Sequence, residues 1–137
     1  MSKDNEQMTA LHLAAKKGDL ETVQVLVDRM SQDALMAGDE KEMTALHLAV
    51  HFGHLEIVQA LVERLPHEAL LAQDKWQWTA LHRAARNGHL EIVQMLCNRM
   101  PQDALTIEDE GQKTALQFAQ EEGHSDVVDF LVNKIYC

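Results

Sequence analysis

The chain has few of the residues that mark secreted or membrane-spanning proteins. Its 137 residues include two cysteines, two prolines and a 4% share of aromatic residues. Because Cys97 falls within an apolar helical pattern and Cys137 is the last residue, no structural disulfide is expected. No apolar run approaches the roughly 20 residues of a membrane-spanning helix, and residues 1–6 are too polar for a secretory signal. We therefore expect no membrane insertion and an intracellular, cytoplasmic location.

Positive charge is also scarce. The chain has 12 lysines and arginines against 22 aspartates and glutamates, which gives a formal net charge of −10. Binding to phosphates depends on a basic surface that releases counterions. Nucleic acid is therefore not an expected partner.

One motif is present in four copies. Thr-Ala-Leu begins at Thr9, Thr44, Thr79 and Thr114, and each copy starts 35 residues after the one before. Self-similarity at such a period is typical of a solenoid, in which each copy is one structural unit that stacks on its neighbours. We therefore expect a single domain over residues 1–137, with repeats at approximately 4–38, 39–73, 74–108 and 109–137. Function is expected on a surface rather than in an enclosed pocket.

Each copy has the pattern of a helix pair. The threonine hydroxyl can cap the start of a short helix, and a glycine ends it, since glycine takes the left-handed conformation without a Cβ penalty. These glycines are Gly18, Gly53, Gly88 and Gly123. An amphipathic second helix follows, with an acid in its first turn and a cation in its last. Ser or Pro followed two residues later by an acid predicts one extra helical turn, at 31–35, 66–70 and 101–105.

The repeated residues resemble the ankyrin repeat. Patterns such as Thr-Ala-Leu-His-x-Ala-Ala and Gly-His-Leu-Glu-Ile-Val, with an Asp five residues before each Thr, cover essentially the whole chain. The resemblance implies an all-α solenoid of four helix-turn-helix repeats with short β-hairpin tips. One departure concerns the tips, where Gln or Glu replaces the family's glycine two residues before Thr. The turns are therefore expected to adopt another conformation or to use a neighbour such as Gly111.

Eight histidines raise the question of a metal or catalytic site. Six recur in register as His12, His47, His82, His54, His89 and His124, and the resemblance implies that they bond loop backbone and tie repeats together. His47 and His51 have a chelating spacing, but no further ligand clearly converges on them. No nucleophile has a base and an orienting group at hand. We expect no metal, no cofactor and no enzymatic activity, and we interpret Asp4, Asp39, Asp74 and Asp109 as turn-forming residues.

The copies differ along one face. In the family that the chain resembles, the tips and the exposed side of the first helix line a concave groove that binds partners. Mapped onto repeats two and three, the expected contact residues are Lys41, Met43, His51, Phe52, Lys75, Trp76, Trp78, Arg83 and Arg86. Trp, Met and Arg are enriched in interface cores. The expected function is that of a monomeric adaptor or scaffold module that binds a partner protein or peptide. The expected partner is acidic and presents an apolar anchor.

Two alternatives stay open. One residue of the pair Trp76 and Trp78 can pack on the adjacent tip instead, in place of the missing turn glycine. The chain can also be a structural or engineered repeat scaffold, or the targeting fragment of a larger protein whose activity lies elsewhere. An exposed apolar patch at the tryptophans favours binding, whereas their burial favours a structural role.

Overall fold

The first helix of each pair follows a repeated threonine and ends at or next to a repeated glycine. The computed structural model describes residues 10–38 and 41–136. Thr44, Thr79 and Thr114 each form a capping box, in which the hydroxyl accepts the third residue's N–H and that residue's side chain bonds the threonine N–H. The four glycines have φ values between 74° and 82°, as predicted. The expected cap at Thr9 and the turns at Asp4 and Asp39 lie outside the described residues.

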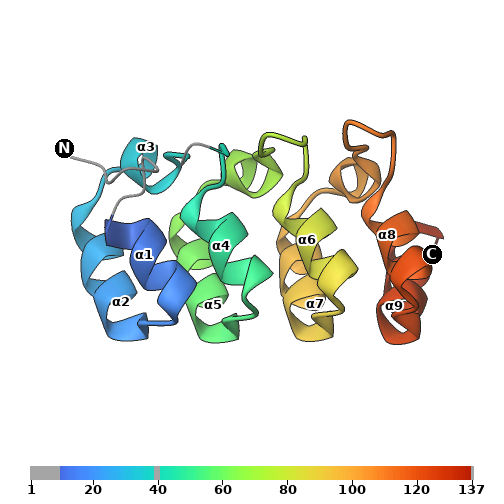
Figure 1. The fold of residues 1–137 in the computed structure, drawn as a ribbon, viewed down its shortest axis with the longest axis horizontal. Coiled ribbons are helices and arrows are strands. Elements are labelled where there is room, and N and C mark those ends of the chain that lie inside the picture. Colours follow the sequence, from blue (N-terminus) through green and yellow to red (C-terminus); the bar gives the residue numbers. More distant parts are fainter. Residues whose placement is uncertain (1–9, 39–40, 137) are drawn as a thin grey trace.

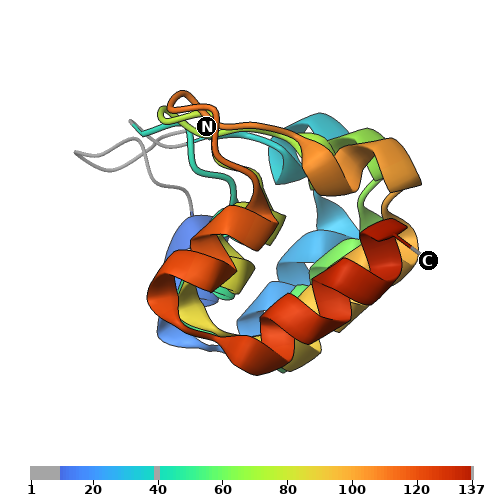
Figure 2. The ribbon, with the colours of Figure 1, turned by 90° about the vertical axis from the view of Figure 1, so that its right-hand side faces the viewer.

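Four helix pairs stack side by side in the described part of the chain (Figure 1). The first helices are α1 (Ala10–Lys17), α4 (Ala45–His51), α6 (Ala80–Asn87) and α8 (Ala115–Glu122). The second helices are α2 (Leu20–Arg29), α5 (Leu55–Arg64), α7 (Leu90–Arg99) and α9 (Ser125–Tyr136). Viewed along the stack, the first helices form one row and the second helices another (Figure 2). The predicted extra turns are present as α3 (Gln32–Leu35), η1 (His67–Leu71) and η2 (Gln102–Thr106).

The core lies between the two rows of helices and between successive pairs. Leu46 and Leu81 from the first helices and Leu61 and Leu96 from the second are fully buried at equivalent positions. Because every pair contributes the same apolar positions, each repeat buries its face against its neighbours. Cys97 is buried in this register, and burial raises the pKa of its thiol to about 12. The prediction that Cys97 forms no disulfide with Cys137 is not tested, because Cys137 lies outside the described residues.

Hydrogen-bonded fingers precede the first helices. In the third finger (residues 74–78), the Asp74 N–H donates to the Trp78 carbonyl at 3.0 Å. The fourth finger (residues 109–113) repeats this bond, from Asp109 to Lys113, at 2.9 Å. One backbone bond, from the Glu110 N–H to the Trp76 carbonyl at 3.2 Å, joins these two fingers. The tips reverse direction like hairpins, but no strand forms within residues 10–38 and 41–136, and the all-α class is confirmed.

The turns of the fingers keep a left-handed residue without glycine. Glu42, Gln77 and Gln112 have φ values of 59°, 64° and 65°. The expectation of another conformation, or of a substitute role for Gly111, was therefore wrong. The fingers retain the backbone geometry of a glycine turn and accept the strain of a Cβ there, which costs roughly 1–2 kcal/mol per residue.

Replacing Gln112 by glycine is expected to stabilise the protein by about 0.5 kcal/mol. Relief of roughly 1–2 kcal/mol of left-handed strain is offset by the roughly 0.5–1 kcal/mol of additional chain entropy that glycine loses on folding. The free energy of unfolding is measured by urea denaturation. Gln112→Ala is the matched control, because alanine keeps the strain. A glycine variant no more stable than the alanine variant would contradict this explanation.

Candidate functional site

Buried histidines connect each repeat to the finger of the next. The Nε2 atoms of His12, His47 and His82 lie 3.0, 3.1 and 3.1 Å from the carbonyl oxygens of Met43, Trp78 and Lys113, respectively. In His47 and His82 the Nδ1 atom accepts the N–H of the capping threonine, so the proton is on Nε2, which donates to the carbonyl. The predicted framework role of these histidines is confirmed.

The same bonds bear on the metal hypothesis for His47 and His51. Both ring nitrogens of His47 are engaged in hydrogen bonds. The Nδ1 atom of His51 lies 3.4 Å from the Arg83 guanidinium, a cationic neighbour that opposes a metal ion. In the part of the chain that the structure describes, no three His, Cys, Asp or Glu residues are grouped to hold a metal.

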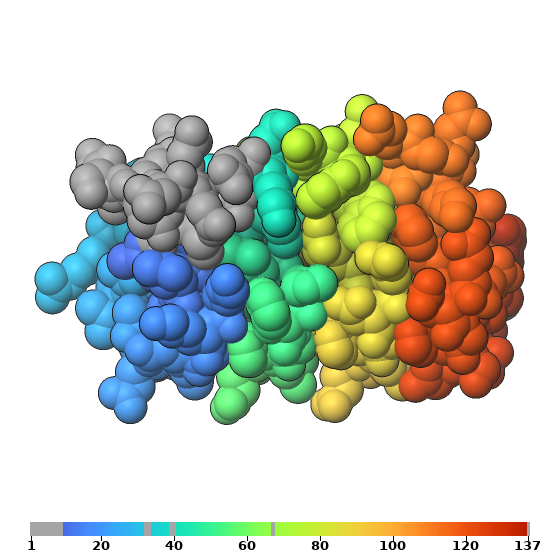
Figure 3. All heavy atoms as spheres, viewed as in Figure 1, coloured from blue at the N-terminus to red at the C-terminus, as the bar shows by residue number. Residues whose placement is uncertain are grey.

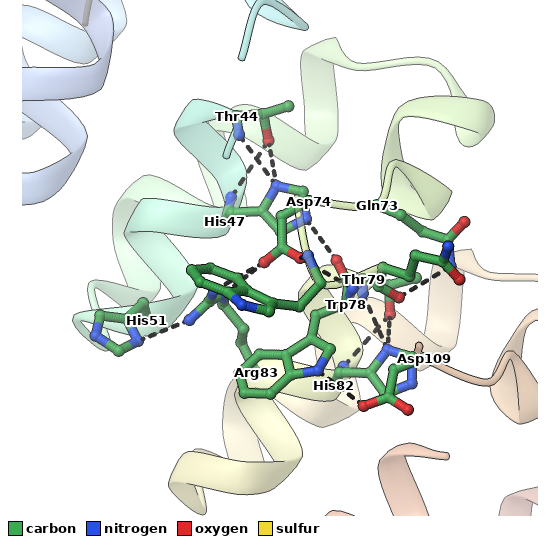
Figure 4. A network of polar contacts seen from close by, with 12 residues as sticks. Thr44, His47, His51, Gln73, Asp74, Trp78, Thr79, His82, Arg83 and Asp109 are labelled. Atoms are coloured by element: carbon green, nitrogen blue, oxygen red, sulfur yellow. Dashed lines mark hydrogen bonds and ion pairs between the residues drawn. The ribbon is translucent and has the colours of Figure 1, made fainter. Parts of the chain in front are cut away.

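Asp74 holds the third finger together from inside. Its Oδ1 atom accepts the N–H groups of Trp76 and Trp78 at 2.9 and 3.0 Å, which confirms the predicted turn-forming role. Its Oδ2 atom accepts Nη2 and Nε of Arg83 at 2.7 and 3.3 Å (Figure 4). The carboxylate is buried, and four donors offset the loss of its hydration. The finger is therefore fixed to α6 by a buried ion pair.

Asp109 holds the fourth finger in the same way, with a tryptophan in place of the arginine. Oδ1 accepts the N–H groups of Gly111 and Lys113, both at 2.8 Å. Oδ2 accepts the indole Nε1–H of Trp78 at 2.9 Å. The Trp78 ring also packs edge-on against Phe118, with centroids 5.1 Å apart. Trp78 therefore joins two repeats, as the structural alternative for one tryptophan supposed.

Two of the nine expected contact residues are buried, contrary to their assignment to an exposed face. Met43 is 6% exposed, because its side chain belongs to the hydrophobic core. Arg83 is also 6% exposed, because Asp74 draws it inward and neutralises it. The sequence held a signal for this ion pair: the positions equivalent to Arg83 are Leu13, Leu48 and Phe118. An arginine in an apolar column near a recurring finger aspartate indicates a buried partner.

The remaining expected residues are exposed or half-buried, and several contact one another. Arg83 lies with its Cζ 5.8 Å from the Trp76 ring centroid, and on its other side it contacts His51. The His51 and Phe52 rings meet edge to face, with centroids 4.8 Å apart. A chain of contacts therefore runs from Trp76, which is 38% exposed, to Phe52, which is 45% exposed. Burial, and then the charges of Arg83 and Arg86, lower the pKa of His51, which favours its neutral form.

A shallow pocket lies where the third finger meets α6. It has a volume of about 210 Å³ and is lined by Trp76, Trp78, Arg83 and Arg86. The two guanidinium groups lie over the Trp78 ring, with Cζ to centroid distances of 4.8 Å for Arg83 and 5.0 Å for Arg86. Figure 3 shows this face of the molecule, with the third finger above α6. Lys41 and Lys75 are exposed beside it, where the Lys75 N–H donates to the Lys41 carbonyl at 2.9 Å.

A family model for ankyrin repeats, which describes three copies, matches residues 1–70 and 63–137. The chain therefore belongs to the ankyrin repeat family. Ankyrin repeats are generally protein–protein interaction modules, and the family is typically non-catalytic. No curated protein matches the sequence. Within residues 10–38 and 41–136, no helix has both the length and the apolar character to cross a membrane.

Acid is expected to weaken the connections between repeats. Burial lowers the pKa of His47 and of His82, whereas an unfolded histidine titrates near pH 6.5. Below about pH 6.5 the unfolded state therefore binds more protons than the folded state, and stability falls as the pH drops towards the lowered folded pKa. The thermal midpoint should be lower at about pH 5.5 than at about pH 7.5.

The variant His82→Gln tests the origin of this dependence. Gln117 holds the equivalent position in the last repeat, where its Oε1 accepts the Thr114 N–H at 2.8 Å. His82→Gln should therefore keep its capping box but lose one titrating group and the bond to Lys113, at a cost of about 1 kcal/mol at neutral pH. Its midpoint should fall less between the two pH values. An equal fall in both proteins would contradict the assignment.

Proposed function

We propose that residues 1–137 act as a single, monomeric ankyrin-repeat domain that binds a protein or peptide on the concave groove of repeats two and three. The observation that carries this proposal is an exposed tryptophan, Trp76, beside a small cationic pocket in a chain with a net charge of −10. The expected ligand is acidic and presents an apolar anchor. The proposed setting is intracellular.

The apolar part of the surface consists of Trp76 and Phe52. Large apolar side chains that stay exposed within a polar surround are typical of interaction sites. Tryptophan is enriched among residues whose truncation costs the most binding energy. Arg83 and His51 connect the two, since Arg83 contacts Trp76 and His51, and His51 contacts Phe52. Because these connecting residues are held by Asp74 and α4, the apolar contacts are preorganised, which reduces the entropy lost on binding.

The charged part of the surface favours an acidic ligand. Lys41, Lys75 and Arg86 are exposed around Trp76. Complementary charge at the rim of an interface mainly raises the association rate and the specificity, and its effect weakens with salt. Arg83 does not belong to this rim, because Asp74 neutralises it. The strongly acidic remainder of the protein disfavours nucleic acid.

The proposal includes no catalysis and no cofactor. The buried histidines and aspartates that could serve as acids, bases or ligands are engaged in hydrogen bonds that hold helices and fingers. A catalytic base must lie within hydrogen-bond reach of the substrate proton that it removes. These histidines and aspartates therefore hold the binding surface in place.

Peptides selected on this protein from a random display library should bind through Trp76. Trp76→Ala should weaken them by about 2 kcal/mol, or roughly 30-fold in Kd, as at an interface hot spot. The affinities are measured by isothermal titration calorimetry. Trp76 is the better choice than Trp78, because Trp78 also holds Asp109 and its removal would disturb the fold.

Tyr136→Ala provides the matched control. Tyr136 is also an exposed aromatic residue, but it lies at the end of α9, in the row of second helices rather than on the face of the third finger (Figure 2). Its truncation should leave the affinities unchanged. Peptides that bind specifically and are indifferent to both Trp76→Ala and Phe52→Ala would show that this groove is not the binding surface.

A further inference from the structure

Two guanidinium groups lie over one indole ring in the third repeat, and among the described residues only one of them has a carboxylate partner. Arg83 is buried and donates to Asp74. Arg86 is exposed, and its Cζ atom lies 5.0 Å from the centroid of the Trp78 ring. In the part of the chain that the structure describes, the ion pairs involve Arg64, Arg83 and Lys113 but not Arg86. Its charge is therefore available to a ligand.

Arg86 is held both at its backbone and at its guanidinium. Its carbonyl oxygen, in the last turn of α6, lies 2.9 Å from Nε2 of His124, which donates to it. Its guanidinium lies over the Trp78 ring, and that ring is fixed by the bond to Asp109 and by Phe118. A guanidinium over an aromatic ring keeps its N–H groups for a planar acceptor. Because the side chain is already ordered, it loses little freedom when an anion binds.

The charges around Arg86 favour a carboxylate over a phosphate. One uncompensated guanidinium matches a single negative charge, and its paired N–H groups match the two oxygens of a carboxylate. A phosphorylated side chain brings a charge of about −1.5 to −2 and is usually met by several cations or a helix N-terminus. Arg86 instead lies at the C-terminal end of α6, where the helix dipole is negative. The net charge of −10 adds to this preference.

The pocket also requires an apolar group close to the carboxylate. Trp76 and Arg86 are walls of the same pocket, whose volume of about 210 Å³ suits one side chain. In an extended segment, residues i and i+2 lie on the same side, roughly 7 Å apart. An acidic side chain on Arg86 and an apolar side chain against Trp76 must therefore be near neighbours in the ligand's sequence.

We propose that Arg86 binds a carboxylate side chain of a partner peptide, while an apolar side chain no more than two residues away occupies the pocket beside Trp76. This inference rests on the proposed function, to which it adds a sequence motif. Of the two arginines that the sequence placed on this face, it gives the electrostatic role to Arg86, because Asp74 neutralises Arg83.

Display selections on three forms of the protein test the motif. Peptides selected on the wild type should be enriched in Asp or Glu within two residues of an apolar residue. Selection on Arg86→Glu should remove that enrichment and favour Lys or Arg at the same position. Arg29→Gln is the control, because it removes an exposed arginine from α2 and should leave the motif unchanged. Circular dichroism checks that each variant remains folded.

Synthetic forms of the best wild-type peptide then test the contact itself. Replacing its acid by the corresponding amide should raise Kd about tenfold on the wild type, and by less than about twofold on Arg86→Gln. Phosphoserine at the same position should bind no more tightly than the acid. Tighter binding of phosphoserine, or an equal amide effect in both proteins, would overturn the assignment to a carboxylate on Arg86.

The two proposals fail in different ways. Peptides that depend on Trp76 but show no preference for an acid would overturn the role of Arg86 and leave the groove as the binding surface. Peptides that bind without dependence on Trp76 or Phe52 would overturn both proposals.

Discussion

A buried carboxylate accepts the backbone N–H groups of each described finger, and the shape of the binding face depends on it. The fingers are too short to form a strand ladder, and a single backbone bond joins the third to the fourth. The N–H groups of Trp76 and Trp78 therefore need another acceptor, which is Oδ1 of Asp74. Asp109 does the same for Gly111 and Lys113. Together with the backbone bonds that close each finger, these acceptors hold the strain of the left-handed turns at Gln77 and Gln112.

The second oxygen of each carboxylate accepts from a different donor in the two fingers. This difference decides which side chains of the third repeat are held by the fold and which are available to a ligand. Asp74 takes the Arg83 guanidinium, and Asp109 takes the Trp78 indole. Arg83 and Trp78, two of the side chains whose chemistry suits recognition, are thereby committed to the fold. Trp76 and Arg86 remain exposed above them. Rigid support beneath a few accessible side chains is what preorganised recognition requires.

Much of the fold could be predicted from the sequence because the same local signals occur in several copies. Thr44, Thr79 and Thr114 cap helices, and Gly53 and Gly88 end them, for reasons that depend only on neighbouring residues. The candidate site was less predictable, because its geometry depends on contacts between repeats. Burial of Met43 and Arg83 follows from how a finger lies on the helices, which no local rule states. The left-handed turn at Gln77 likewise runs against local preference and depends on Asp74.

Amide hydrogen exchange of the third finger tests most directly whether its buried carboxylate fixes the binding face. If Asp74 holds the finger as the structure shows, the N–H groups of Trp76 and Trp78 should exchange slowly, at rates near those of the α6 amides, although they lie outside any helix. Both N–H groups donate to Oδ1 of Asp74, so their protection should come from the carboxylate. Rapid exchange at Trp76 and Trp78, beside slow exchange in α6, would contradict the account.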